Sequence, residues 1–261
     1  MKSPKVTVLM PVYNGEKYLR EAIESILNQT FKDFEFLIIN DGSTDKSVEI
    51  IESFKDTRIR LVHNEKNIKL IARGEYIARM DCDDISLSER LQEQVNYLFA
   101  NPQINVLGTG FQTINQKGEI LEDIVYFPDS EKIIAWDLLF YCPIAHPTVM
   151  MRKKIIKEIG GYLSESDIYE KKNLYVEDYY LWSKLNNIKE FTITNISKVL
   201  LKLRKHGDNI TSIYLDENKK NSALISYENM KRYFDIDITE EFIYSIVFNQ
   251  LNQCEVIKSL N

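Results

Sequence analysis

The sequence has few of the residues that build disulfide frameworks and structural metal sites. Its 261 residues include three cysteines and three histidines, and no two cysteines stand in a CxxC arrangement. An odd number of such cysteines is typical of free thiols in a reducing compartment. Structural zinc sites need Cys and His ligands at short regular spacings, which are absent. We therefore expect a cytoplasmic protein and exclude a structural zinc protein.

The sequence also lacks an excess of positive charge and a long hydrophobic run. Lys and Arg number 33 against 39 Asp and Glu, for a net charge of -6. Proteins that bind nucleic acid usually carry a basic face, so we expect no nucleic acid partner. No apolar run approaches the about 20 residues of a membrane span, and the N-terminus does not resemble a signal peptide. Any contact with the inner face of a membrane is expected to be peripheral.

The first third of the chain alternates strand-like and helix-like segments. β-branched and apolar residues predict strands at 6–10, 34–39, 59–62 and 76–80. Apolar residues at helical spacing predict helices at 17–29 and 45–54. This order indicates an α/β fold with a mostly parallel central sheet flanked by helices. Ser86-Leu87-Ser88-Glu89 then has the spacing of a capping box, which predicts a helix that starts there.

Polar residues follow the carboxyl ends of the predicted parallel strands. Pro11 and Tyr13 follow the first strand, Asp41 the second, and the run Asp81 to Asp84 the fourth. Ligands of open α/β sheets bind just beyond these strand ends, so we expect the three loops to converge on one crevice. An aromatic face beside a carboxylate suits a flat base with an N–H edge. A pyrimidine nucleotide would fit there.

The run Asp81-Cys82-Asp83-Asp84 places three carboxylates within four residues. An isolated run of this kind is more often a solvated acidic turn. Like charges this close repel one another unless a cation relieves them, and Mg²⁺ is typically held by one or two carboxylates together with phosphate oxygens. After a buried strand, the run is therefore a candidate anchor for a divalent metal and a diphosphate, where the metal would neutralise charge on the leaving group.

A second acidic pair, Glu177-Asp178, stands at the predicted start of a helix. Acidic residues are common at this position because they complement the helix dipole, and that needs no function. In the functional interpretation, one of them is a general base, which must come within hydrogen-bond reach of the hydroxyl that it deprotonates. The sequence alone leaves both interpretations open.

Six stretches together resemble the family 2 glycosyltransferases of the GT-A fold, many of which build bacterial surface polysaccharides. They are Val8 to Asn14, Asn40 to Asp45, Gly74 to Asp84, Ala145 to Thr148, Gly160 to Tyr162 and Glu177 to Trp182. The resemblance implies a GT-A domain over residues 1–212 and a small helical C-terminal appendage over 213–261. It also implies inverting transfer of a sugar from a UDP-sugar to a saccharide or lipid-linked acceptor hydroxyl, in cell-surface polysaccharide synthesis.

The resemblance further assigns donor-binding and metal-binding residues. Tyr13 and Asp41 would contact the uracil, with Pro11 beside them, and Asp81 would lie on the ribose side. The metal, Mn or Mg, would belong to Asp83 and Asp84. In that pair, Asp83 would hold the metal that bridges the diphosphate, and Asp84 would support the loop.

The remaining assignments fall in the second half of the chain. Asp178 would be the catalytic base, with Glu177 as its neighbour. Arg204 and His206 resemble the family's basic C-terminal segment and would meet the donor diphosphate, where charge-assisted hydrogen bonds would stabilise the leaving group. His146, in a loop, is another candidate for contact with the donor, although a lone histidine is more often structural.

Two features leave other outcomes open. The chain could be a catalytically silent subunit that binds a sugar nucleotide. A nucleotidyltransferase is disfavoured, because such enzymes usually have a Gly-rich basic loop near the first strand and residues 11–17 contain none. The stretch from Asn67 to Gly74 is also short, because a parallel crossover with its helix takes at least about 10 to 12 residues. Either residues of a mobile loop are missing there, or the segment is genuinely deleted and the donor site is incomplete.

Overall fold

The structure, a computed structural model, describes residues 3–63, 72–158, 176–188, 190–207, 209 and 213–234. The chain forms two compact units. The first unit comprises Met1–Asp129, Ile144–Tyr162 and Thr192–His206, and the second comprises Ser130–Pro143, Leu163–Phe191 and Gly207–Asn261. Because these units interleave along the chain, they do not coincide with the predicted division into 1–212 and 213–261. That division stays a prediction.

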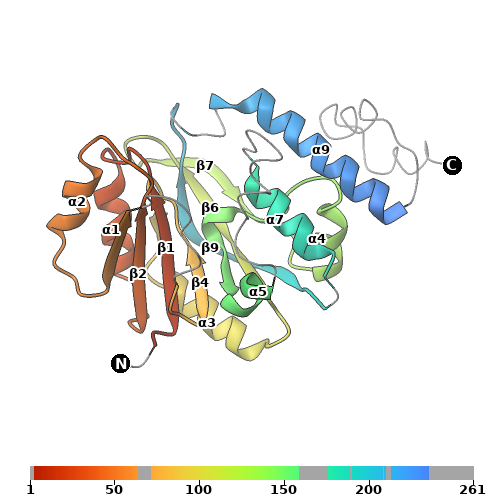
Figure 1. The fold of residues 1–261 in the computed structure, drawn as a ribbon, viewed down its shortest axis with the longest axis horizontal. Helices are drawn as coiled ribbons and strands as arrows, with labels where there is room; N and C mark the ends of the chain where they lie inside the picture. The colour runs from red at the N-terminus through yellow and green to blue at the C-terminus, as the bar shows by residue number, and fades with distance from the viewer. Residues whose placement is uncertain are drawn as a thin grey trace. The chain divides into compact units, whose positions relative to one another are not determined.

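The first unit is built on a sheet that has nine strands among the described residues. The strands are β1 (Val6–Val12), β2 (Phe34–Asn40), β3 (Ile59–His63), β4 (Tyr76–Arg79), β5 (Ile85–Ser86), β6 (Val106–Ile114), β7 (Ile120–Val125), β8 (Met150–Arg152) and β9 (Ile193–Arg204). They lie in the order β3-β2-β1-β4-β8-β6-β9-β5, and β7 pairs with β6. Figure 1 shows β2, β1 and β4 running side by side.

The sheet is parallel in its first half and mixed in its second. β3, β2, β1 and β4 pair in parallel, as the alternating sequence pattern predicts. Beyond them, β8 is antiparallel to both β4 and β6, whereas β9 is parallel to β6. β6 and β7 form an antiparallel hairpin. The sheet as a whole is therefore mixed, with its predicted parallel part at one side.

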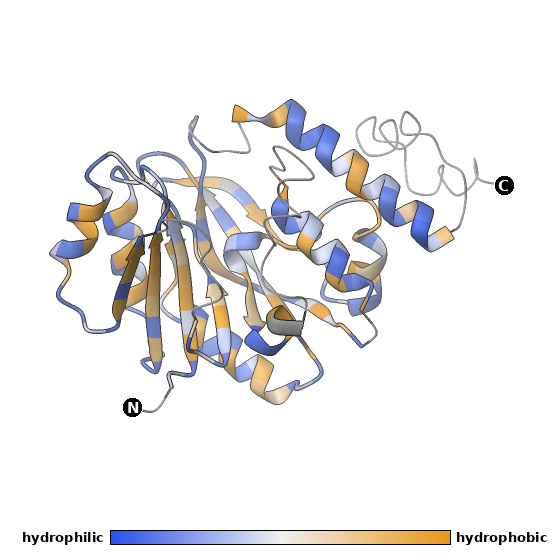
Figure 2. Cartoon of the chain, viewed as in Figure 1, coloured by the Kyte–Doolittle hydropathy of each residue, from blue (hydrophilic) through white to orange (hydrophobic). Residues whose placement is uncertain are grey.

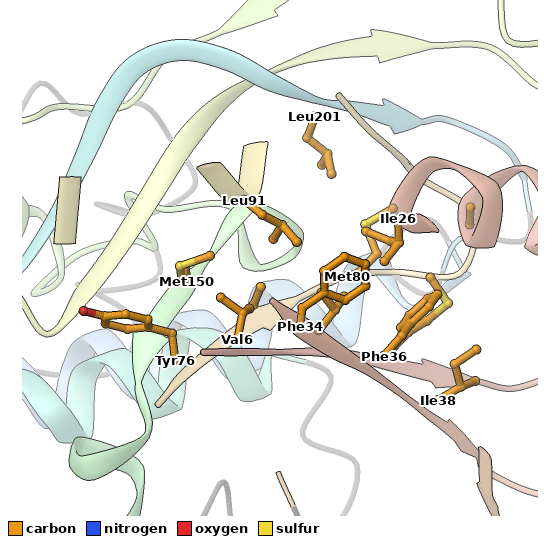
Figure 3. Close-up of a cluster of buried hydrophobic side chains, with 14 of the residues drawn as sticks. Val6, Ile26, Phe34, Phe36, Ile38, Tyr76, Met80, Leu91, Met150 and Leu201 are labelled. Atoms are coloured by element: carbon orange, nitrogen blue, oxygen red, sulfur yellow. The ribbon is translucent and has the colours of Figure 1, made fainter. Parts of the chain in front are cut away.

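Helices α1 (Leu19–Leu27), α2 (Ser47–Ser53) and α3 (Arg90–Ala100) belong to the first unit, with the short α5 (Lys153–Glu158) and the 3-10 turn η1 (His146–Thr148). α1 buries the apolar face that its sequence predicts, and Ile26 of this helix lies with Phe34 and Met80 in the core (Figure 3). Hydrophobic residues also run along β1 and β2 (Figure 2). Each fully buried side chain of this size contributes about 1.5 to 3 kcal/mol.

Helix α3 begins at Arg90, so the predicted capping box is wrong. Ser86 lies in β5, which pairs with β9, and its hydroxyl accepts a hydrogen bond from Gln29 Nε2 at 3.1 Å. Leu87 N donates to the carbonyl of Leu200 at 3.0 Å. The backbone N–H of Ser86 donates to Ser25 Oγ at 3.1 Å, so side chains from α1 and the residues after it take both groups that a capping box would use, and tertiary partners override the local motif.

The connection from β3 to β4 includes residues 64–71, which lie outside the described residues, so the question of a deletion stays open. Hydrogen bonds anchor the residues just before β4, where the chain re-enters the sheet. Thr7 Oγ1 donates to Glu35 Oε1 at 2.7 Å, and the backbone N–H groups of Arg73 and Gly74 donate to Glu35 and Thr7 at 2.6 and 2.8 Å. A buried carboxylate with charged and polar donors thus fixes where β4 begins.

The second unit contains helices α4 (Glu131–Asp137), α7 (Glu177–Asn186) and α9 (Leu215–Phe234). α7 and α9 lie side by side (Figure 1). The carbonyl oxygen of Leu138 accepts hydrogen bonds from Tyr179 Oη of α7 at 3.1 Å and Asn229 Nδ2 of α9 at 3.0 Å. Asn229 also donates to Ser183 Oγ at 2.9 Å. In the described part of the chain, no helix has the length and apolar character needed to span a membrane.

Candidate functional site

The ends of β1 and β2 are neighbours, as predicted. Val12 pairs with Asn40, and Asp41 N donates to the carbonyl of Val12 at 2.9 Å. β1 continues through Pro11 to Val12, whereas the sequence suggested that it stops at Pro11. The pairing of β1 with β4 ends near Leu9. Pro11 has no N–H to donate, and it can lie in this strand because it stands beyond the last residue that pairs with β4.

Two loops that follow these strands are joined by side-chain hydrogen bonds. Asn14 N donates to Ser43 Oγ at 3.0 Å, and Asn14 Oδ1 accepts from Thr44 N at 2.8 Å. Glu16 N donates to Asp45 Oδ2 at 2.9 Å. Asn14 has a φ of 50°, which short polar side chains tolerate better than most residues. These contacts hold Tyr13 and Asp41 on adjacent strand ends.

Tyr13 and Asp41 are both exposed, and the Tyr13 side chain is 66% accessible. The exposed ring of Tyr13 offers a face on which a flat base can stack. The acidic turn lies against the same loop, because a Cβ added at Gly15 would come within 3.0 Å of Cys82 Sγ. The structure therefore brings together the three loops that the sequence predicted to converge.

The acidic turn is compact and largely enclosed. Asp81 forms an ion pair with Arg79 at 2.7 Å. Burial, together with the nearby charges of Asp83 and Asp81, raises the pKa of the Cys82 thiol to about 12. Cys82 is thus a neutral packing residue at the centre of the turn, and the carboxylates around it carry the charge.

Asp83 is paired with His206. His206 Nε2 lies 2.9 Å from Asp83 Oδ2, and the Asp83 side chain keeps 23% of its surface accessible. Burial and the charge of Asp81 raise the pKa of Asp83, while the contact with His206 acts in the opposite direction. A cation would relieve the repulsion between Asp81 and Asp83, and carboxylate and imidazole are both ligands of Mn²⁺.

This donor set fits a divalent metal that is shared with a nucleotide. No group of three or more His, Cys, Asp or Glu side chains arranged to hold a metal exists among the described residues. A metal held by one or two protein ligands and by substrate phosphates does not need such a group. Asp83 and His206 therefore suit a metal that binds together with a diphosphate.

Asp84 faces away from solvent, and its side chain supports the loop. Oδ1 accepts a hydrogen bond from Arg204 N at 2.9 Å, and the residue is 3% exposed. Burial, then the charges of Asp81 and Asp83, raise the pKa of Asp84 well above its usual range. Its carboxylate links the acidic turn to the end of β9, and its role in the loop stays a prediction.

Arg204 is fully buried at the end of β9, and its guanidinium is directed at protein atoms. Nε donates to the carbonyl of Asp83 at 2.8 Å, and Nη1 donates to the carbonyl oxygens of Asn115 and Gln116 at 3.1 and 3.3 Å. Nη2 forms an ion pair with Glu21 of α1. In this arrangement Arg204 positions the acidic turn through the Asp83 carbonyl, whereas His206, the other predicted diphosphate contact, lies 2.9 Å from Asp83 Oδ2.

Two residues of the site were missed by reasoning from sequence. Tyr18 packs its ring against Arg204 and His206, although its place in a helical pattern suggested only a core residue. Arg90 is fully buried and donates to the carbonyl of Arg79 at 2.7 Å, and burial lowers its pKa to about 10. An arginine on the apolar side of an amphipathic helix was the available signal for Arg90.

His146 lies in η1 of the first unit and is partly buried. Burial and the positive charge of Arg79 lower the pKa of His146 well below its usual value. Its imidazole is therefore neutral near pH 7 and suits a packing or hydrogen-bonding role better than a charged contact with a diphosphate.

Glu177 and Asp178 form the first turn of α7 in the second unit, so the predicted helix start is confirmed. Glu177 is exposed and Asp178 is half-buried. Asp178 Oδ1 accepts a hydrogen bond from Tyr179 N at 2.7 Å, and Oδ2 lies 3.9 Å from Cys142 Sγ. A negative charge at this helix N-terminus complements the helix dipole.

Solved structures with the same architecture define the class of the fold. TarS of Staphylococcus aureus in complex with UDP-GlcNAc superposes with a TM-score of 0.66 at 23% identity, over 95% of this chain and 72% of that one. A mannosyltransferase of Pyrobaculum calidifontis, solved with GDP-Man and Mn²⁺, superposes with a TM-score of 0.59 at 15% identity, over 96% and 71% of the two chains. The chain has the GT-A fold.

Sequence comparison narrows this class to a family. Residues 7–160 match the sequence model described as glycosyl transferase family 2. An uncharacterised glycosyltransferase of Methanocaldococcus jannaschii is 35% identical over 95% of this chain and 88% of its own length. An O-antigen biosynthesis glycosyltransferase of Escherichia coli is 33% identical over 85% of each chain. The chain belongs to glycosyl transferase family 2 and is a glycosyltransferase.

Proposed function

We propose that the protein moves a sugar from a UDP-sugar to a hydroxyl of a saccharide or lipid-linked acceptor, with inversion, in the cytoplasmic synthesis of a cell-surface polysaccharide. The observation that carries the proposal is the convergence of three strand-end loops around Asp83 and His206 in the first unit. The E. coli relative named for O-antigen biosynthesis supports the polysaccharide role. A contact with the inner face of the membrane would be peripheral.

The nucleoside part of the donor is assigned to the first two loops and the start of the acidic turn. The exposed Tyr13 ring would stack on the uracil and the Asp41 carboxylate would accept from its N–H edge, with Pro11 shaping the strand end behind them. Asp81, held by Arg79, would meet the ribose. The TarS complex with UDP-GlcNAc, which shares the fold, supports a uridine donor.

The diphosphate part is assigned to a Mn²⁺ or Mg²⁺ held by Asp83, with His206 beside it and Asp84 bracing the turn from its buried side. Bound there, the cation would neutralise the charge that develops on the diphosphate. Burial and the charge of Asp81 raise the pKa of Asp83, and a nearby cation would offset both effects. The Mn²⁺ in the mannosyltransferase structure supports the choice of metal.

Asp178 is assigned as the general base of a single displacement, with Glu177 as its neighbour. The acceptor hydroxyl gives its proton to the Asp178 carboxylate as its oxygen bonds to the anomeric carbon. The bond between that carbon and the diphosphate oxygen breaks in the same step, and the configuration inverts. One base therefore suffices, and no covalent glycosyl-enzyme is needed. The position of Asp178 in the first turn of α7, where the helix dipole favours negative charge, supports this assignment.

The test is a calorimetric titration of UDP and GDP with and without Mn²⁺. We expect Mn²⁺-dependent binding of UDP to the wild type, abolished in Asp83→Ala. Asp123→Ala is the matched control, because Asp123 is an exposed aspartate of the same unit that forms an ion pair with Lys205 at 3.0 Å. It should bind UDP as the wild type does. Absence of nucleotide binding under every condition would contradict the proposal, whereas binding without transfer in every donor screen would favour a catalytically silent subunit.

A further inference from the structure

Tyr18 carries a polar group that the fold does not explain. The residue stands immediately before α1, and 9% of its surface is exposed. Its hydroxyl is buried and has no hydrogen-bond partner in the described part of the chain. Burying an unpaired hydroxyl is unfavourable, and a phenylalanine would fill nearly the same space without that cost. A hydrogen-bond acceptor on a bound ligand would remove this cost.

Positive groups surround the Tyr18 ring. The guanidinium carbon of Arg204 lies 4.6 Å from the ring centroid, and Lys17 Nζ lies 4.9 Å from it. The ring of His206 is tilted by 39° with its centroid 5.0 Å away. Because these neighbours carry or can accept positive charge, they favour a negatively charged hydrogen-bond acceptor near the phenol.

The same neighbours connect Tyr18 to Asp83. Arg204 Nε donates to the Asp83 carbonyl at 2.8 Å, and His206 Nε2 lies 2.9 Å from the Asp83 carboxylate. Tyr18 is thus separated from the carboxylate assigned to the metal by a single layer of side chains. His206 therefore links the Tyr18 ring to the Asp83 carboxylate.

We propose that Tyr18 is a further donor-binding residue, whose hydroxyl donates a hydrogen bond to a diphosphate oxygen of the bound nucleotide. The inference rests on the proposed function and adds a residue to that site. The hydroxyl is covered in the described arrangement, so binding must uncover it. His206 contacts both the Tyr18 ring and Asp83, and a ligand at Asp83 that turns this imidazole opens the way to the phenol.

Tyr18→Phe is the decisive variant because it removes only the oxygen. A hydroxyl that gains its partner on binding contributes nothing to the free protein, so the melting temperature of the free variant should equal or exceed that of the wild type. The Mn²⁺-dependent affinity for UDP, measured by calorimetry, should fall about tenfold, as expected for a hydrogen bond to a charged group.

Tyr76→Phe is the matched control in the same unit. Tyr76 is also buried, but its hydroxyl accepts a hydrogen bond from Arg152 Nη1 at 3.2 Å and it lies at the start of β4, away from the acidic turn. This variant should melt at a lower temperature and bind UDP as the wild type does.

The possible outcomes separate the inference from the function on which it rests. Wild-type protein that fails to bind UDP with Mn²⁺ contradicts the proposed function itself. Wild-type binding that Tyr18→Phe leaves unchanged overturns only the role of Tyr18. A melting temperature of free Tyr18→Phe lowered as much as that of Tyr76→Phe also overturns it, because the hydroxyl would then be paired before the nucleotide arrives.

Discussion

The two units use carboxylates in opposite ways. In the first unit, Asp81, Asp83 and Asp84 are crowded into one turn, and burial and mutual repulsion raise the pKa values of Asp83 and Asp84. In the second, Glu177 and Asp178 stand in the first turn of a helix, where the macrodipole favours negative charge. The first arrangement gains from a cation and suits a metal with a diphosphate. The second places carboxylates where the helix dipole favours negative charge, and it is the position proposed for the general base.

The two sites also differ in how they are supported. The acidic turn is braced from behind by Arg204, a buried residue that bonds to three backbone carbonyls and to Glu21. Helix α7 is braced by Asn229 of α9, which donates to Ser183 and to the carbonyl of Leu138. Changes at Arg204 should therefore affect donor binding, and changes at Asn229 should affect sugar transfer.

The largest effect is expected for Asp178→Asn. Loss of the base should lower the turnover number about 1,000-fold, within the range usual for general base catalysis. The affinity for UDP and Mn²⁺ should be unchanged, because the donor residues lie in the first unit. The measurement is a transfer assay alongside calorimetry. Glu177→Gln should have a much smaller effect, and a reversed order of the two variants would move the role of base to Glu177.

Arg204→Met should have the next largest effect, on the stability of the first unit. It leaves the buried carbonyl oxygens of Asp83 and Asn115 without their donor, at a cost of about 2 to 3 kcal/mol. The midpoint of urea unfolding should be lower than that of the wild type. UDP should also bind more weakly, because the acidic turn loosens. Lys205→Met, at the exposed neighbouring position, should change stability by less than about 0.5 kcal/mol. Equal stability of the two variants would exclude the bracing role.

Asn229→Ala should have the smallest of the three effects, confined to the second unit. Loss of its two hydrogen bonds should cost about 1 to 2 kcal/mol and lower transfer modestly, since α7 carries Asp178. Calorimetry with UDP should show no change. Lys231→Ala, an exposed change on the same helix, serves as the control. Weaker binding of UDP to Asn229→Ala would break the proposed separation of the two units.

Much of the first unit could be predicted from sequence because its signals are local. The alternation of apolar strands and amphipathic helices gave the parallel half of the sheet, and strand ends located Tyr13, Asp41 and the acidic turn. The six motifs gave the family and the GT-A fold. The assignment of roles to single residues stays a prediction, since it came from the family resemblance.

The features that could not be predicted from the sequence depend on contacts between segments that are distant along the chain. The bracing position of Arg204 follows from the pairing of β9 with β6, which places residue 204 opposite Ile114, about ninety residues earlier in the chain. No local pattern reports that pairing. Ser86 failed as a helix cap for the same reason, because β9 takes it into the sheet. Tyr18 had the spacing of a core residue, and only its unpaired hydroxyl marks it out.

The most direct test of the central claim is the Mn²⁺-dependent binding of UDP to the wild type, Asp83→Ala and Asp178→Asn, measured by calorimetry under one set of conditions. If the first unit binds the donor and the second supplies the base, Asp83→Ala loses binding and Asp178→Asn binds as tightly as the wild type. Binding that survives in Asp83→Ala, or is lost in Asp178→Asn, would contradict this division of roles.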